Sequence, residues 1–309
     1  MKPNKNNKWS FWLKMLGAII LVLFIAVGGY AYYVYNSLSQ AVDTMQEPIE
    51  REKSEKRLEP VTLEQKQPFS VLLLGVDERE GDRGRSDTLI VVTVNPDTKT
   101  TKMLSIPRDT RTEIIGKDFE DKINHAYAFG GVEMSMDTVE NFLDIPIDYY
   151  MKINMEGFKD IVEAVDGITV QNDLDFTYEG DHFPKGEILL NADEALKYSR
   201  MRYEDPRGDF GRQSRQREII KGVIKKGASF SSLTRFDEIF DALGKNIKTN
   251  IQFDEMVDIQ TNYKESAESI QQMEVSGKGA KIDGIYYFIV ADEEKQKLQQ
   301  TFKEHLKMK

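Results

Sequence analysis

Hydrophobic residues form one long uncharged run near the N-terminus and, from residue 69 onward, short apolar runs that alternate with amphipathic stretches. The runs FSVLLLGVD (69–77), DTLIVVTVN (87–95) and KMLSIP (102–107) are rich in apolar and β-branched residues and are bounded by turn residues. Such runs predict strands buried on both faces. Four shorter runs predict further strands: YYMKI (149–153), GITV (167–170), SIQQMEV (269–275) and IYYFIV (285–290).

Helical periodicity separates these strands. The stretch at 125–145 predicts a helix with a break at Gly130-Gly131, and 155–165 predicts an amphipathic helix. At 191–200, Asn191 is a candidate N-cap and Glu194 follows at the third helical position, close to a capping box. Further helices are expected at 209–226, 233–247, 253–263 and 293–306. The alternation predicts one α/β domain over 69–309, a central mixed β-sheet covered by helices on both faces (an α-β-α sandwich).

Residues 15–34 carry no charge and, as a helix rising about 1.5 Å per residue, would cross the ~30 Å core of a bilayer. Four lysines precede the run and the first acidic residue is Asp43, so the C-terminal part is expected outside the cell. A cleaved signal peptide is the alternative, but the run is long and Gly28-Gly29-Tyr30 is a poor cleavage site. We expect a cytoplasmic tail (1–14), a single transmembrane anchor (15–35) and a solvated, charge-rich extracellular linker or stalk (36–68).

Composition removes several kinds of chemistry. The chain has no cysteine, which excludes disulfides, thiolate nucleophiles and cysteine metal sites. Its three histidines, His125, His182 and His305, have no spacing typical of a zinc site or a catalytic triad. After residue 35 the chain has 38 basic and 52 acidic residues, a balance of 38 − 52 = −14. With no basic stripe interleaved with aromatics, nucleic acid is a poor candidate ligand.

Arginine is unevenly distributed. Eleven of the fourteen arginines fall in three clusters that follow strand-like or helical segments, while lysines are scattered. Guanidinium can bind two phosphate oxygens at once, and α/β sheets bind ligands at strand ends. The clusters therefore predict a site for a compact anion such as pyrophosphate, although surface salt bridging is the better explanation for any single arginine. The clusters are Arg79, Arg83 and Arg85; Arg108 and Arg111; and Arg200, Arg202, Arg207, Arg212, Arg215 and Arg217.

Pyrophosphate usually arrives with a divalent cation. Asp77 and Asp87 flank the first arginine cluster and are candidate oxygen ligands for magnesium, which takes one or two carboxylates together with phosphate and water. The spacing of two aspartates ten residues apart is common by chance, so the pattern alone supports the metal weakly.

Three segments together resemble the LytR–CpsA–Psr proteins of Gram-positive bacteria: residues 72–110, INHAYAFGG (123–131) and YSRMRYEDPRGDFGRQSRQ (198–216). The combination of G-R-S-D-T, I-P-R-D and R-x-R-x6-D-x2-R is specific, although each piece alone is not. The resemblance covers about 69–224 and includes the N-terminal run. It implies an enzyme that transfers an anionic glycopolymer, usually wall teichoic acid, from a polyprenyl-pyrophosphate carrier to the 6-hydroxyl of N-acetylmuramic acid in peptidoglycan, forming a phosphodiester.

The resemblance also implies roles for individual residues. Asp77 and Asp87 match magnesium-binding (or manganese-binding) aspartates, and Arg108 matches an arginine close to the reacting phosphate. Asp209 matches a functional position and is, with Asp109, a candidate base. The remaining matches are to pyrophosphate-binding positions: Arg85, Arg200, Arg202, Arg212 and Gln216. Arg79, Arg83, Arg207, Arg215 and Arg217 match less securely, and salt bridging is favoured there.

Two other functions stay open at this point. The chain could be a membrane-anchored, non-catalytic regulator or scaffold of envelope synthesis, or a polyprenyl-pyrophosphate hydrolase that uses water as acceptor. The expected partners are the lipid-linked glycopolymer, peptidoglycan and the cell membrane. A polyprenyl tail would need an apolar slot between sheet and helices. Ordinary core packing explains each of the apolar residues that would line such a slot.

Overall fold

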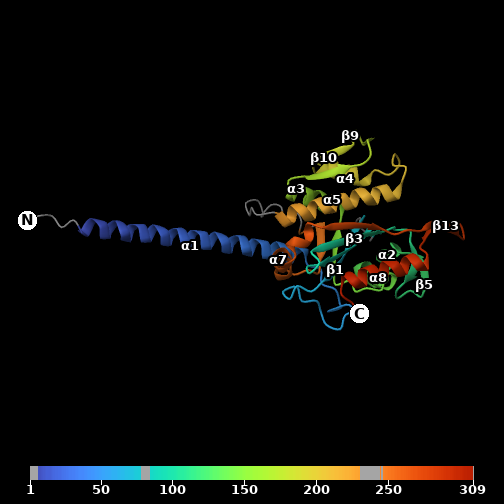
Figure 1. Ribbon diagram of the computed structural model, residues 1–309, viewed down its shortest axis with the longest axis horizontal. Coiled ribbons are helices and arrows are strands. Elements are labelled where there is room, and N and C mark those ends of the chain that lie inside the picture. Colours follow the sequence, from blue (N-terminus) through green and yellow to red (C-terminus); the bar gives the residue numbers. More distant parts are fainter. Residues whose placement is uncertain (1–5, 78–83, 230–243, 245, 309) are drawn as a thin grey trace, which may run out of the picture.

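A six-stranded mixed sheet organises the protein, shown in Figure 1 as a computed structural model that describes residues 6–77, 84–229, 244 and 246–308. The strand order is β11-β6-β1-β2-β3-β12. β1, β2 and β3 form an antiparallel meander, β6 joins β1 in parallel and β12 joins β3 in parallel. The strands are β1 (Phe69–Val76), β2 (Ser86–Asn95), β3 (Thr100–Ile106), β6 (Tyr149–Ile153), β11 (Ile247–Thr249) and β12 (Ile270–Glu274).

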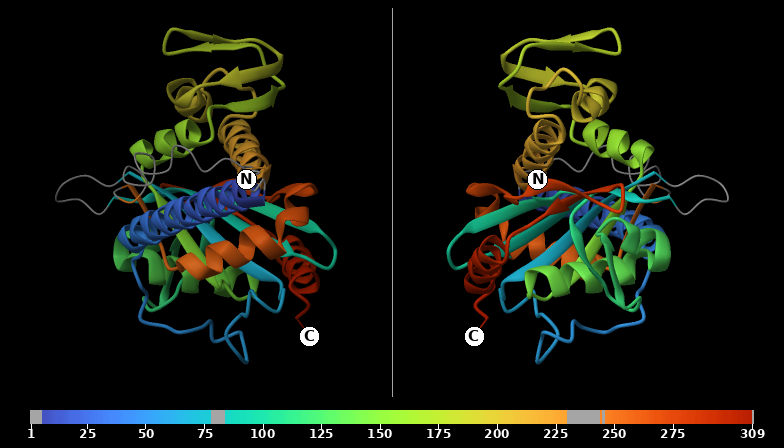
Figure 2. Two further views of the ribbon diagram at one scale, coloured as in Figure 1. Left: turned by 90° about the vertical axis from the view of Figure 1, so that its left-hand side faces the viewer. Right: turned by 90° about the vertical axis from the view of Figure 1, so that its right-hand side faces the viewer.

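Both faces of this sheet are covered by helices, because successive side chains of a strand point to opposite faces. On one face, Leu72 and Leu74 of β1 pack in a core with α2 (His125–Leu143) and α8 (Asp292–His305). On the other face, Ile90 of β2 packs against Ile220 and Ile224 of α5 (Asp209–Ser229). Beside α5, α7 (Phe253–Asn262) covers the end of β1. The predicted sandwich is confirmed, as Figure 2 shows.

A smaller layer with its own core lies beyond α5 (Figure 2). The rings of Phe176 and Phe183 stack with centroids 4.9 Å apart, and Tyr198 lies against Phe176 at 5.8 Å. The last helix of this layer ends at Arg200, where the third arginine cluster begins. The elements of the layer are α3 (Met155–Ala164), β7 (Ile168–Asn172), β8 (Phe176–Tyr178), β9 (Asp181–Phe183), β10 (Gly186–Leu190) and α4 (Ala192–Arg200).

The predicted helix signals are confirmed at two places. α2 has a break at Gly131, whose φ of 68° and ψ of −147° are accessible to glycine and costly for other residues. α4 begins with a complete capping box between Asn191 and Glu194. It ends at Arg200, and Met201 is already extended. The helix predicted at 233–247 falls mostly on residues outside the described part, and its last residue, Ile247, begins strand β11.

Short hairpins were not predicted. β4 (Arg111–Ile114) pairs with β5 (Phe119–Lys122), β8 pairs with β9, and β13 (Lys278–Ile282) pairs with the predicted β14 (Ile285–Ile289). The sequence of β5 is FEDK, with no buried residue. A strand this short and polar shows no apolar alternation, so periodicity could not reveal it.

The N-terminal region contains a single long helix and a docked connection. α1 (Asn6–Met45) projects from the domain (Figure 1), and many of its apolar side chains are exposed. Among the residues that the structure describes, no helix combines the length and apolar character required of a membrane span. The segment after α1 is not the solvated spacer that we expected. Its charges meet acidic partners on the domain: Arg51 pairs with Glu140 and Arg57 with Asp148, while Leu63 is buried.

Candidate active site

A β-bulge between β1 and β2 positions two acidic residues of the site, Asp77 and Asp87. Gly75 pairs with Thr88 and Val76 with Ser86, so Asp87 is an extra residue in the ladder, a β-bulge. Bulges bend a strand and re-aim a side chain. A Cβ at Gly75 would lie 2.9 Å from Cβ of Thr88, so only glycine allows this close approach. Asp77 lies beside this bulge, since its backbone N–H donates to the Arg85 carbonyl at 3.5 Å.

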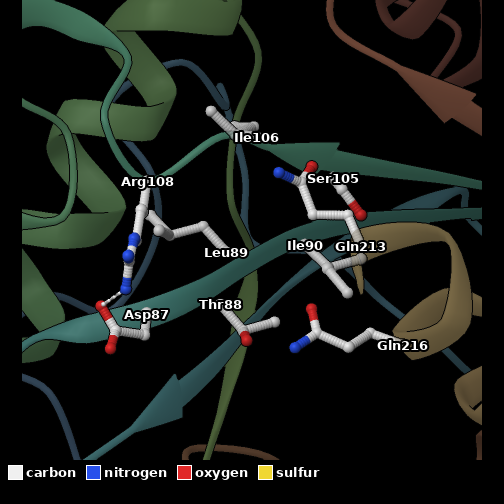
Figure 3. Close-up of a pocket in the computed structure, with 9 residues that line it drawn as sticks. All are labelled: Asp87, Thr88, Leu89, Ile90, Ser105, Ile106, Arg108, Gln213 and Gln216. Atoms are coloured by element: carbon white, nitrogen blue, oxygen red, sulfur yellow. Dashed lines mark ion pairs between the residues drawn. The ribbon is translucent and has the colours of Figure 1, made fainter. Parts of the chain in front are cut away.

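Arg108 meets Asp87 directly. Nη1 of Arg108 lies 2.9 Å from Oδ1 of Asp87, as Figure 3 shows. The two residues come from the start of β2 and just past the end of β3, which are adjacent in the sheet. Burial alone would lower the pKa of the Arg108 guanidinium, but the carboxylates of Asp87, Asp209 and Asp109 outweigh it and raise this pKa above its ordinary value. Arg108 is thus a fixed cation at the strand ends.

The first turn of α5 supplies a second cation. Nη2 of Arg212 lies 2.8 Å from Oδ1 of Asp209 and 3.5 Å from the Asp87 carbonyl oxygen. Gln213 donates to the other Asp209 oxygen at 2.8 Å. Burial alone would raise the pKa of the Asp209 carboxyl, but the charges of Arg212 and Arg108 and the bond from Gln213 lower it. Both oxygens of Asp209 are thus already bound by side chains of the same helix turn, and this geometry favours Asp209 as an organiser of the site.

A narrow pocket opens beside these charges, between β2, β3 and α5 (Figure 3). Two buried polar atoms in its lining, Oγ of Ser105 and Oε1 of Gln216, have no hydrogen-bond partner. Buried polar atoms are nearly always satisfied, so these two are available to hydrogen-bond a polar ligand or water. The lining residues are Asp87, Thr88, Leu89, Ile90, Ser105, Ile106, Arg108, Gln213 and Gln216.

Two predicted arginines make contacts elsewhere. Nη1 of Arg200 lies 3.9 Å from Glu179 at the tip of the β8–β9 hairpin, and the Arg202 guanidinium lies 5.7 Å from the centre of the Tyr203 ring. We expected α4 to end near Ser199 and the chain to extend beyond it, presenting both guanidiniums to one anion. The helix end is as expected to within one residue, and Arg200 is its last residue, directed toward Glu179.

Three other arginines are structural, as the salt-bridge interpretation predicted. Arg207 pairs with Asp173 and Asp205, and Arg217 is buried against Gln272 and Glu274 of β12. Arg215 is buried with Asp205. Arg79 and Arg83 lie outside the described residues.

Sequence reasoning missed three residues around the site: Lys122, Ser105 and Gln213. Nζ of Lys122 lies 2.7 Å from Asp109, next to Arg108. Gln213 could have been found, because it follows Asp209 by four residues on a helix and therefore shares its face. Lys122 and Ser105 gave no local signal, since only the tertiary fold brings them to the site.

The acidic side chains of the site are the candidate ligands for a metal ion. Within the described ranges, no three acidic or histidine side chains form a group that could hold a metal ion. Asp77 and Asp87 offer two carboxylates at neighbouring strand ends, which is the number that magnesium commonly takes from protein when phosphate completes its shell. The donor set therefore fits a magnesium ion that binds together with a phosphorylated ligand.

Comparison with known proteins shows the family to which the chain belongs. The chain is 52% identical over 306 residues to the polyisoprenyl-teichoic acid–peptidoglycan teichoic acid transferase TagU of Bacillus subtilis (strain 168), covering 99% of both chains. The crystal structure of B. subtilis TagU matches with a TM-score of 0.65 and 53% identity, over 79% of this chain and 99% of that one. TagT bound to LIIa-WTA matches with a TM-score of 0.72 and 33% identity, over 83% and 97%. The LytR_cpsA_psr family pattern matches residues 32–304, and the chain belongs to this family.

Proposed function

We propose that the protein is a phosphotransferase that moves wall teichoic acid from a polyprenyl-pyrophosphate carrier to the N-acetylmuramic acid 6-hydroxyl of peptidoglycan. Relatives at 52–54% identity are named as teichoic acid transferases acting on peptidoglycan, and TagT has been solved with a ligand named as WTA. The observation in this chain that carries the proposal is the presence of two carboxylate-paired cations at one site: Arg108, which lines the pocket, and Arg212, which reaches the carbonyl of the lining residue Asp87.

The arrangement suits transfer of a phosphoryl group, which depends on positioning and on stabilising charge. The acceptor oxygen would form a bond to the phosphorus that carries the polymer. The bond from this phosphorus to the oxygen of polyprenyl phosphate would break, and the hydroxyl proton would leave to solvent or a base. Arg108 and Arg212 would stabilise the charge that grows on the leaving phosphate, together with Arg85, which directly precedes β2. Arg200, Arg202 and Gln216 remain candidate pyrophosphate contacts, and Asp109 a candidate base.

Asp77 and Asp87 would hold a magnesium or manganese ion. When bound, the ion supplies positive charge to the pyrophosphate oxygens. Asp87 could keep Oδ1 on Arg108 and offer its second oxygen to the ion, because a carboxylate has two oxygens. Asp87→Ala should lower binding of manganese, followed by electron paramagnetic resonance, with a non-cleavable pyrophosphate analogue present. Asp173→Ala is the control, since Asp173 is also exposed and paired with an arginine. Unchanged manganese binding in Asp87→Ala would remove Asp87 from the ligand set.

The proposal is tested by reconstitution. Purified full-length protein in detergent, lipid-linked teichoic acid and peptidoglycan stripped of teichoic acid should give polymer joined to muramic acid by a phosphodiester. Release of free polymer with no linkage would indicate a hydrolase, and no reaction of the wild-type protein would support a scaffold. Arg108→Ala should remove activity, whereas Arg207→Ala, which removes another carboxylate-paired arginine, should keep most of it.

We further propose that residues 15–35 anchor the protein in the cell membrane, with 1–14 in the cytoplasm and the domain outside. Support comes from the basic N-terminal tail and from the exposed apolar side chains of α1, among them Leu21, Phe24 and Ile25 at 62%, 75% and 66% exposure. Protease added to intact, wall-stripped cells should digest the domain. Protection of the domain in intact cells and digestion after lysis would place it inside and contradict the proposed topology.

A further inference from the structure

Two phenylalanines stand partly exposed on the surface, one on β5 and one in the first turns of α2. The side chain of Phe119 on β5 and that of Phe129 in the first turns of α2 belong to residues that are 45% and 40% exposed. Their rings meet edge-on with centroids 5.9 Å apart. The His125 ring lies 6.0 Å from Phe129, and Nζ of Lys117 lies 5.6 Å from the Phe129 centroid. We call these four residues the Phe119–Phe129 platform.

The backbone ties this platform to the candidate active site. The Asn124 N–H donates to the carbonyl of Arg108 at 3.3 Å, and α2 begins at the next residue, His125. Phe129 follows His125 by one helical turn, a rise of about 5.4 Å. On the β5 side, Lys122 reaches Asp109 at 2.7 Å. The β4–β5 hairpin packs against α2, so the platform lies on two elements that both contact the Arg108–Asp109 segment.

Core packing does not explain the two rings. α2 is held in the core by Ala126 and Tyr127, which are 0% and 2% exposed. The break at Gly131 separates the first turns of α2, with Phe129, from the rest of the helix. The helix is therefore anchored without Phe129, and two large apolar rings are left adjacent and partly exposed to solvent. Adjacent exposed aromatics are typical of binding surfaces.

Charge distinguishes between the two polymers that the reaction joins. The β4–β5 segment, residues 111–122, has three basic residues and four acidic residues, a balance of 3 − 4 = −1. The β4–β5 segment therefore offers no net positive charge to attract a polyphosphate such as teichoic acid. A glycan presents the C–H faces of its rings to aromatic side chains and its hydroxyl and amide groups to mixed polar neighbours. The charged residues are Arg111, Lys117 and Lys122, and Glu113, Asp118, Glu120 and Asp121.

We infer that the Phe119–Phe129 platform binds the glycan strand of the peptidoglycan acceptor and guides its muramic acid hydroxyl toward Arg108. This inference rests on the proposed transferase function. It assigns the acceptor to the surface formed by β5 and α2, and leaves the anionic donor to the arginines at the strand ends.

The test uses steady-state kinetics of full-length protein in which acceptor and donor are varied separately. Phe119→Ala and Phe129→Ala should each raise KM for stripped peptidoglycan, by up to about tenfold, and leave KM for the lipid-linked donor unchanged. Phe129→Trp should restore binding. Leu189→Ala is the matched control, because Leu189 is 67% exposed on β10, away from the platform. A rise in donor KM alone would assign the platform to lipid or teichoic acid and overturn the inference, as would unchanged acceptor KM in both variants.

A second measurement separates this inference from the proposed function. Pelleting with insoluble, stripped peptidoglycan needs no catalysis, so it reports acceptor binding even if the wild-type protein transfers nothing. Weaker pelleting of Phe119→Ala and Phe129→Ala, with the thermal midpoint unchanged, supports the platform. Wild-type pelleting by both variants contradicts it, whatever the enzyme assay shows.

Discussion

Nη1 of Arg215 lies 2.6 Å from Oδ2 of Asp205, and both side chains are buried. Arg215 also donates to the carbonyls of Tyr198 and Met201, so one guanidinium fixes the end of α4 and the loop that follows. The pair therefore shapes the segment that presents Arg200, Arg202 and the start of α5. Its role is to position other residues of the arginine cluster.

Removing one partner of this pair should destabilise the fold strongly. Arg215→Met leaves Asp205 buried with less compensation, and such losses cost about 3–5 kcal/mol. Urea unfolding followed by circular dichroism measures the change. The control is Arg207→Ala: Arg207 shares the same carboxylate but its side chain is 42% exposed, so we expect less than about 1 kcal/mol. Equal unfolding midpoints for Arg215→Met and wild type would show that the pair adds no stability.

Gly211 should tolerate no side chain. A Cβ there would lie 1.8 Å from Oδ2 of Asp205, and Asp205 cannot move aside because Arg207 and Arg215 hold it. Gly211→Ala should cost about 1–3 kcal/mol through overpacking. Gly227 lies later on the same helix, and a Cβ at this position would meet nothing within 4 Å. Gly227→Ala should therefore stabilise by roughly 0.5–1 kcal/mol. A shift of the same sign in both variants would contradict the steric argument.

Arg212→Lys tests whether the guanidinium shape matters at the site. Arg212 holds Asp209 with two nitrogens, at 2.9 and 2.8 Å, and a lysine cannot reproduce this fork. Losing one charge-assisted contact in the transition state should slow transfer roughly ten- to a hundredfold. Lys221→Arg on the same helix is the control, because Lys221 pairs locally with Glu218. Transfer by Arg212→Lys at the wild-type rate would make Arg212 a structural partner of Asp209 alone.

His305 predicts a pH dependence of stability. Its imidazole is buried between the hydroxyls of Thr93 and Thr100, and burial, with the charge of Lys102, lowers its pKa to about 4. The ordinary pKa is about 6.5, so the unfolded chain binds the proton more readily. Neutral His305 therefore contributes fully to the free energy of unfolding above about pH 6.5. This contribution is lost as the pH falls toward 4, by about 3 kcal/mol at most. In His305→Gln, the slope of unfolding free energy between pH 7 and 4.5 should be smaller. An unchanged slope would contradict this assignment.

The sheet was predictable where strands are long and apolar. β1, β2 and β3 are buried on both faces, so composition alone revealed them, and the capping box at Asn191 gave the start of α4. The β4–β5 and β8–β9 hairpins were not predictable, because three- and four-residue strands stabilised by a turn have no periodicity of their own.

The sequence predicted which types of residue form the site, but not how those residues are arranged in space. The three arginine clusters indicated an anion site, yet the sequence cannot show which arginines are exposed. Arg212 and Arg215 are three residues apart on α5, but Arg212 reaches the carbonyl of Asp87 and Arg215 is buried with Asp205. Their difference depends on how the 201–208 loop folds back, a tertiary contact with no local signal. The pairing of Asp87 with Arg108 likewise follows from the register of β2 against β3.

The antiparallel meander has a consequence for the order in which the site can assemble. Asp77, Asp87 and Arg108 all belong to β1, β2 and β3 or to residues beside them, so their contacts close only short loops. Arg212 and the parallel strand β12 come from more than one hundred residues later in the chain. Closing longer loops costs more conformational entropy and slows folding. The part of the site that holds Asp77, Asp87 and Arg108 can therefore form with the first hairpins, and α5 adds Arg212 only when the chain returns across the sheet.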